Sequence, residues 1–90
     1  MSIEEVINNA VTLNRTLEIE YCTRSGSVFF CEIEKIRYSP YYGGQYIQAV
    51  RMDLGEERTF KVSRILSING HSFSRIFWRQ LGDNFKRIQD

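Results

Sequence analysis

The first apolar residues of the chain recur at intervals of three and four, the spacing that places side chains on one face of an α-helix: Ile3, Val6, Ile7, Ala10 and Leu13. Ser2 precedes them, and Glu5 follows Ser2 by three positions, which is the form of a capping box. Such a box satisfies backbone N–H groups in the first helical turn. The pattern therefore predicts a helix over residues 2–14, ending near Asn14.

Beyond this helix, apolar positions alternate with polar ones, as they do in half-buried β-strands. Residues 17–22 alternate strictly, and a turn over residues 24–27 follows them. The alternation in the next strand, Val28 to Tyr38, changes phase near Glu34 and Lys35. One extra residue there would restore a common inward face, so we expect a β-bulge that bends the strand sharply. Three more strands are predicted, at residues 46–52, 57–62 and 65–68.

One helix, five consecutive strands with short connections and a bent strand define an α+β, mostly β, fold. We expect the five antiparallel strands to close into a small barrel, which would leave no exposed sheet edge. After the strands, Phe73, Phe77 and Leu81 recur at intervals of four and predict a short C-terminal helical extension. The whole chain, residues 1–90, is interpreted as one domain: helix at 1–14, barrel at 15–70 and extension at 71–90.

Composition limits the classes of function. A length of 90 residues with 42% hydrophobic side chains fits one small globular domain. No apolar run is long enough to span a membrane and the N-terminus lacks the basic start of a signal peptide, so we expect a cytoplasmic protein. Cys22, Cys31 and the single His71 do not form a metal-binding pattern, and we expect buried or inert thiols. No catalytic constellation or phosphate-binding glycine loop is present in the sequence, so we expect neither enzymatic activity nor a cofactor.

Charge is distributed unevenly along the chain, although the net charge is only +1. Residues 1–20 carry one basic and four acidic side chains, a net −3, whereas residues 21–90 carry eleven basic and seven acidic ones, a net +4. Any site for an anion is therefore expected in the later part of the chain.

Basic residues recur at an interval of three in one strand and its exit: Arg58, Lys61 and Arg64. We expect these three cations to converge with Tyr46 on one barrel face, with Tyr42 and Arg37 at its rim. Arginine and lysine bind phosphate groups, and aromatic rings stack on unpaired bases. Arg24 and Arg51 are secondary candidates, and Tyr21 and Tyr38 are assigned to packing. The alternative from the residues alone is a solvated face on which the arginines pair with glutamates, namely Glu32, Glu34, Glu56 and Glu57.

These elements, in this order, resemble the WYL domain, a bacterial module with an Sm-like small β-barrel. The family's Trp-Tyr-Leu motif aligns with Gln45-Tyr46-Ile47, its upstream proline with Pro40, and its basic motif with Arg58-Thr59-Phe60-Lys61-Val62-Ser63-Arg64-Ile65. The resemblance covers roughly residues 3–70. Two positions depart from the pattern, because Gln45 replaces the tryptophan and Ser63 stands where an aspartate is common.

The resemblance implies a non-enzymatic regulatory domain that binds single-stranded nucleic acid or a nucleotide-like anionic ligand. WYL domains commonly follow a helix-turn-helix DNA-binding domain, for which this chain has no room, so a partner regulator is a further expectation. The other class of function left open is a protein-protein contact or homodimer. It would use aromatic residues of the C-terminal segment, namely Phe73, Phe77, Trp78 and Leu81.

Overall fold

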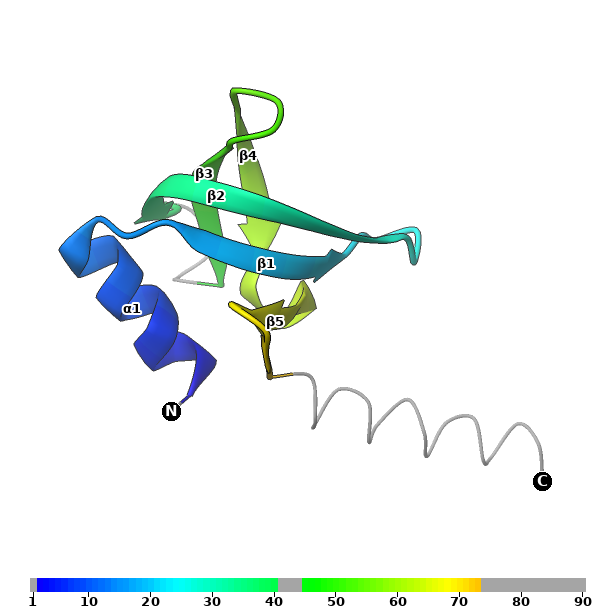
Figure 1. The fold of residues 1–90 in the computed structure, drawn as a ribbon, viewed down its shortest axis with the longest axis horizontal. Helices are drawn as coiled ribbons and strands as arrows, with labels where there is room; N and C mark the ends of the chain where they lie inside the picture. The colour runs from blue at the N-terminus through cyan, green and yellow to red at the C-terminus, as the bar shows by residue number, and fades with distance from the viewer. Residues whose placement is uncertain (1, 41–44, 74–90) are drawn as a thin grey trace.

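The computed structural model describes residues 2–40 and 45–73 (Figure 1). One helix precedes a single antiparallel sheet, and a short 3₁₀ helix interrupts the order of strands. The elements are α1 (Ile3–Leu13), β1 (Leu17–Cys22), β2 (Val28–Tyr38), β3 (Tyr46–Arg51), β4 (Glu56–Lys61), η2 (Val62–Arg64), β5 (Ile65–Ile68) and β6 (His71–Ser72). The prediction of an α+β, mostly β, fold is confirmed. The predicted C-terminal helical extension lies outside the described residues, except at its first three positions.

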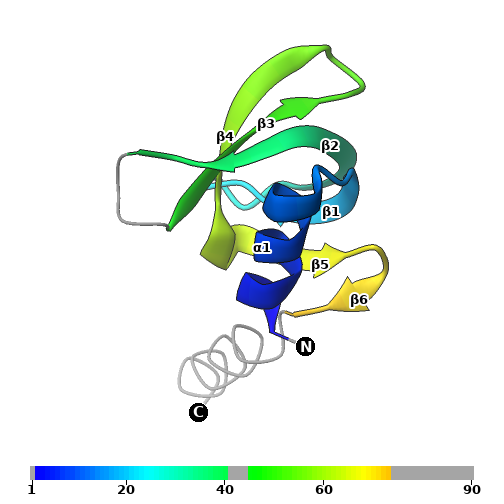
Figure 2. The same ribbon diagram turned by 90° about the vertical axis from the view of Figure 1, so that its left-hand side faces the viewer.

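The helix α1 begins and ends where the sequence predicts. The Ser2 side-chain oxygen accepts a hydrogen bond from the Glu5 backbone N–H at 3.2 Å, which caps the first turn. At the other end, Asn14 adopts a left-handed conformation with φ 52°, a common way for a helix to stop. Ile7 and Ala10 are buried, and Figure 2 shows the helix lying across the sheet. In the part of the chain that is described, no helix is both long and apolar enough to cross a membrane.

The strands follow the order β4-β3-β2-β1-β5-β6 in one sheet. Strands β4 and β6 are its two borders and do not pair with each other, so the sheet is not closed. The expected five-stranded barrel is therefore wrong in two respects. The sheet stays open, and a sixth strand, β6, pairs with β5 through Ser67 opposite Ser72. A two-residue strand has too few positions to show an alternation in the sequence.

The predicted β-bulge in β2 is confirmed. Glu34 lies opposite Val50 and Arg37 opposite Gln48, so that β2 has one more residue than β3 between these pairs. Lys35, inside this irregularity, has φ 52°. The extra residue lets Ile33 before the bulge and Ile36 after it both face the core, although three positions separate them.

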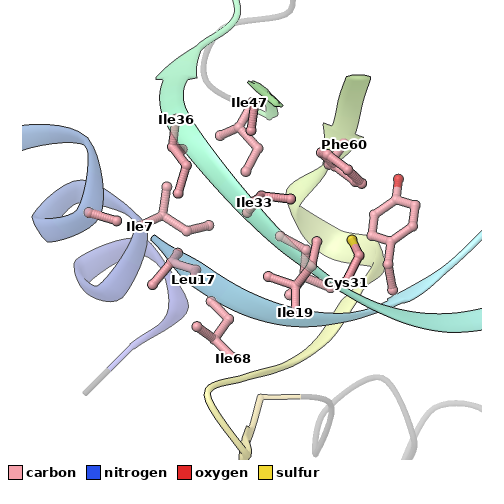
Figure 3. Close-up of a cluster of buried hydrophobic side chains, with 13 residues drawn as sticks. Ile7, Leu17, Ile19, Cys31, Ile33, Ile36, Ile47, Phe60 and Ile68 are labelled. Carbon is pink, nitrogen blue, oxygen red and sulfur yellow. The ribbon is translucent and has the colours of Figure 1, made fainter. Parts of the chain in front are cut away.

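The hydrophobic core lies between α1 and the concave side of the curled sheet (Figure 3). Figure 3 shows Ile7 of α1 directed toward Leu17 and Ile36. Strand β5 is buried at all four positions, which explains why its sequence does not alternate. Phe73, the last described residue, is partly buried against the same core. The helix and five of the strands thus form one packed unit, and the candidate site lies at its margin.

Candidate anion-binding site

A pocket of about 470 Å³ lies where the end of β4, the helix η2 and the hairpin after β1 meet. Two tyrosines, one threonine and three basic residues line it: Tyr21, Arg24, Tyr46, Thr59, Lys61 and Arg64. No carboxylate belongs to this lining among the described residues. The described lining of the pocket is therefore both cationic and aromatic.

Lys61 and Tyr46 meet because their strands pair in register. Tyr46 at the start of β3 lies directly opposite Lys61 at the end of β4. The Lys61 Nζ atom is 6.0 Å from the centre of the Tyr46 ring, at the outer limit of a cation–π contact. The antiparallel register thus places an ammonium group and an aromatic ring side by side in the pocket lining.

Arg64 reaches the same pocket because the helix η2 turns the chain between β4 and β5. Its Nη1 group donates a hydrogen bond to the backbone carbonyl of Thr23 at 3.2 Å. This bond fixes the guanidinium against the β1–β2 hairpin and leaves further N–H groups to meet a ligand. Arg24, the next residue after Thr23, adds the third cation of the lining.

Tyr21 connects the pocket to the core. Its residue surface is 9% exposed, and its ring packs on Phe60 and Phe29 with centroid separations of 5.1 Å and 5.8 Å. Its hydroxyl oxygen accepts a hydrogen bond from the Lys61 backbone N–H at 2.9 Å. Burial raises the pKa of Tyr21, although the Lys61 N–H and the charge of Arg64 act in the opposite direction. The phenol is therefore neutral at physiological pH and keeps its proton.

Sequence reasoning assigned Tyr21 to packing, which the structure confirms, but missed its place in the pocket. Its alternation with Glu20 and Cys22 marks an inward-facing residue and contains no signal for a ligand contact. Only the pairing of β1 with β5 and the turn at η2 bring the end of β4 to its hydroxyl. Tyr38, also assigned to packing, is 38% exposed and lies outside the pocket lining.

Arg58 and Arg37 do not line the pocket. Arg58 forms an ion pair with Glu56, and Arg37 forms one with Glu57 at 2.9 Å and a hydrogen bond with Gln48. Because side chains alternate across a strand, Arg58 lies on the face opposite Lys61. The expected convergence of Arg58, Lys61 and Arg64 is therefore corrected.

The candidate cations fall into two groups, those that pair with a carboxylate and those that line the pocket. Arg37 and Arg58 pair with glutamates, as the alternative of a solvated face predicts. Lys61 and Arg64 have no carboxylate partner within residues 2–40 and 45–73, and Arg24 joins them in the lining. Tyr42, the remaining predicted site residue, lies outside the described residues.

Arg51, a secondary candidate, forms an ion pair with Asp53 and does not line the pocket. Its guanidinium donates two hydrogen bonds to the Asp53 carboxylate, at 2.8 Å and 2.9 Å, and lies 4.4 Å from the centre of the Phe29 ring. The Arg51 guanidinium holds the pKa of Asp53 below its usual value. The charges of Arg51 and Asp53 thus neutralise each other at the turn after β3, outside the pocket.

Metal ligands do not gather in the described part of the chain, where no group of three or more His, Cys, Asp or Glu side chains is placed to hold an ion. Cys22 and Cys31 are free thiols, and burial raises the pKa of Cys31.

Of the C-terminal aromatic residues, Phe73 packs on the core, whereas Phe77, Trp78 and Leu81 lie outside the described residues. The homodimer hypothesis thus rests on the sequence alone.

Comparison of the chain with models of protein families and with curated proteins found no match. The resemblance to the WYL domain remains a prediction from the sequence.

Proposed function

We propose that the protein is a non-enzymatic regulatory domain of the WYL type that binds single-stranded nucleic acid or a nucleotide-like anionic ligand in this pocket. One observation carries the proposal: Lys61 and Arg64, which no carboxylate neutralises in the described part of the chain, line the same pocket as Tyr46. The cations supply attraction for phosphate, and the tyrosine supplies a surface on which a base can stack.

The chemistry of the lining favours phosphate. Arginine presents several N–H donors in a planar fork, whereas lysine presents a compact point charge. Arg64 is already held by the Thr23 carbonyl, so less side-chain freedom is lost when a ligand binds. Stacking of a base on an aromatic ring contributes roughly 1–3 kcal/mol and tolerates any base, which suits a single strand.

Fluorescence polarisation with labelled single-stranded DNA and RNA of about 12 nucleotides, a length within the range that one OB-fold domain covers, tests the proposal. Measurements at low and at physiological ionic strength should show affinity falling steeply with salt, because phosphate contacts release counterions. Unlabelled mononucleotides serve as competitors. The double substitution Lys61→Ala, Arg64→Ala should abolish binding. An affinity that ignores salt, or that survives the double substitution, would contradict the proposal.

A further inference from the structure

The Tyr21 hydroxyl can donate a hydrogen bond as well as accept one. Its oxygen accepts from the Lys61 backbone N–H, and no group within residues 2–40 and 45–73 accepts its own hydrogen. A neutral phenol can do both at once. The residue is more than nine-tenths buried, yet it belongs to the pocket lining. A ligand oxygen is therefore the natural acceptor for this proton.

Three different donors surround the same space. Tyr21 comes from β1, Lys61 from the end of β4 and Arg64 from η2. An anion that satisfies all three needs acceptor oxygens pointing in several directions. A terminal phosphate has three such oxygens and a charge of about −1.5 to −2, whereas each internal phosphodiester of a nucleic acid carries a single charge. Among the described residues, the lining has three cations and no carboxylate, which matches the more highly charged group.

Burial of Tyr21 restricts which phosphate can approach it. An internal phosphodiester carries a nucleoside on both sides, and these must pass the pocket walls together with it. A phosphate at a chain end, or on a free nucleotide, carries one nucleoside only. The pocket volume of about 470 Å³ lies in the usual range for small ligands, roughly 300–1,000 Å³. Tyr46, half-buried in the same lining, provides aromatic surface for that one nucleoside.

We propose that the pocket recognises a terminal phosphate, on a mononucleotide or at the end of a single strand, and that the Tyr21 hydroxyl donates a hydrogen bond to it. This inference rests on the proposed function and narrows its ligand. Lys61 and Arg64 neutralise the phosphate, and Tyr21 distinguishes a terminal phosphate from an internal one because only the former reaches its hydroxyl.

Three oligonucleotides of one sequence test the inference: one with a 5′-phosphate, one with a 3′-phosphate and one with hydroxyls at both ends. We expect at least one phosphorylated end to tighten binding to the natural chain by about ten- to hundredfold, the effect of one hydrogen bond to a charged group. Tyr21→Phe keeps the ring that packs in the core and removes the hydroxyl. It should remove the part of the preference for the phosphorylated end that the hydroxyl supplies, so the ratio of the two affinities should fall about tenfold. Tyr38→Phe, a change at an exposed tyrosine outside the pocket, should leave the preference intact.

The outcomes separate the inference from the function on which it rests. Equal affinity of the natural chain for all three oligonucleotides would overturn the terminal-phosphate inference and leave nucleic-acid binding in place. A preference that Tyr21→Phe leaves undiminished would overturn the role of Tyr21. No binding of any oligonucleotide or mononucleotide at low salt would remove both. The comparison of the three strands needs no variant, so its result does not depend on whether Tyr21→Phe folds.

Discussion

Arg64 offers the sharpest test of the pocket, because a matched control lies six residues earlier in the chain. Arg64→Ala removes one of the three cations in the lining, and Arg58→Ala removes the same formal charge elsewhere. Arg58 pairs with Glu56 and lies on the opposite face of β4 from Lys61. The two substitutions change the net charge equally but differ in their distance from the proposed ligand.

The structure sets the expected magnitudes. A hydrogen bond to a charged group contributes about 1.5–3 kcal/mol, so loss of Arg64 should weaken binding about ten- to hundredfold. It should also reduce the slope of log affinity against log salt by about 0.7, the value for one phosphate contact on a single strand. Arg58 lies outside the pocket and is exposed, so its removal should change affinity by about twofold or less.

Fluorescence polarisation over a series of salt concentrations measures both the affinity and the slope. Thermal unfolding of each variant shows whether loss of the Arg64 bond to the Thr23 carbonyl disturbs the fold. If the two variants lose affinity equally, binding follows net charge and the pocket is not the site. If Arg64→Ala binds as tightly as the natural chain, the assignment of Arg64 is wrong.

Three further predictions concern stability. Ile33 is 0% exposed in the core, so Ile33→Ala should cost about 2–5 kcal/mol of unfolding free energy in urea titration, and a loss below about 1 kcal/mol would contradict the close packing described. Ser2→Ala removes the cap of α1 and should cost about 0.5–2 kcal/mol in the same assay, with loss of helical circular dichroism as the first sign; no change would mean that the cap contributes nothing. Because burial raises the pKa of Tyr21, the folded chain holds this proton more tightly than the unfolded one. The protonated Tyr21 should contribute fully to the free energy of unfolding below about pH 10, and this contribution should disappear as the pH rises through the pKa of the folded state. Tyr21→Phe should reduce the loss of stability at alkaline pH. An equal loss in the natural chain and in the variant would refute the assignment of a raised pKa to Tyr21.

Local features of the fold were predictable because they depend on neighbouring residues. The capping box at Ser2 and the spacing of apolar residues predicted α1 to within a residue at each end. The change of phase near Lys35 predicted the bulge, since an extra residue must restore the inward face of β2. These signals lie within a few positions of the feature that they predict.

Closure of the sheet was not predictable in the same way. Whether β4 meets the opposite border depends on the curl of the whole sheet, to which many residues contribute a little. Strand β6 has two residues, and all four of β5 are buried, so neither shows an alternation. The barrel was inferred from strand order, which does not fix how far the sheet bends.

The candidate site was predicted in part. An interval of three in a strand puts residues on opposite faces, so the spacing of Arg58 and Lys61 argued against a shared pocket from the start. Arg64 shares a pocket with Lys61 only because η2 replaces extended chain between them. Tyr21 and the hairpin that carries Arg24 enter the site because Lys61 bonds to Tyr21 and Arg64 to Thr23, contacts between residues about 40 positions apart that no local pattern contains.

The open sheet has a consequence for how copies of the chain behave when crowded. A strand at a sheet border is a template on which a second molecule can extend the sheet, and repeated addition produces aggregates. Strand β4 forms such a border, and four of its six residues are charged: Glu56, Glu57, Arg58 and Lys61. Because an added strand would have to desolvate these charges, the border resists fibre-like growth. Both glutamates that pair with Arg37 and Arg58 belong to this border strand, so the same charges that occupy these two arginines also oppose the addition of another strand.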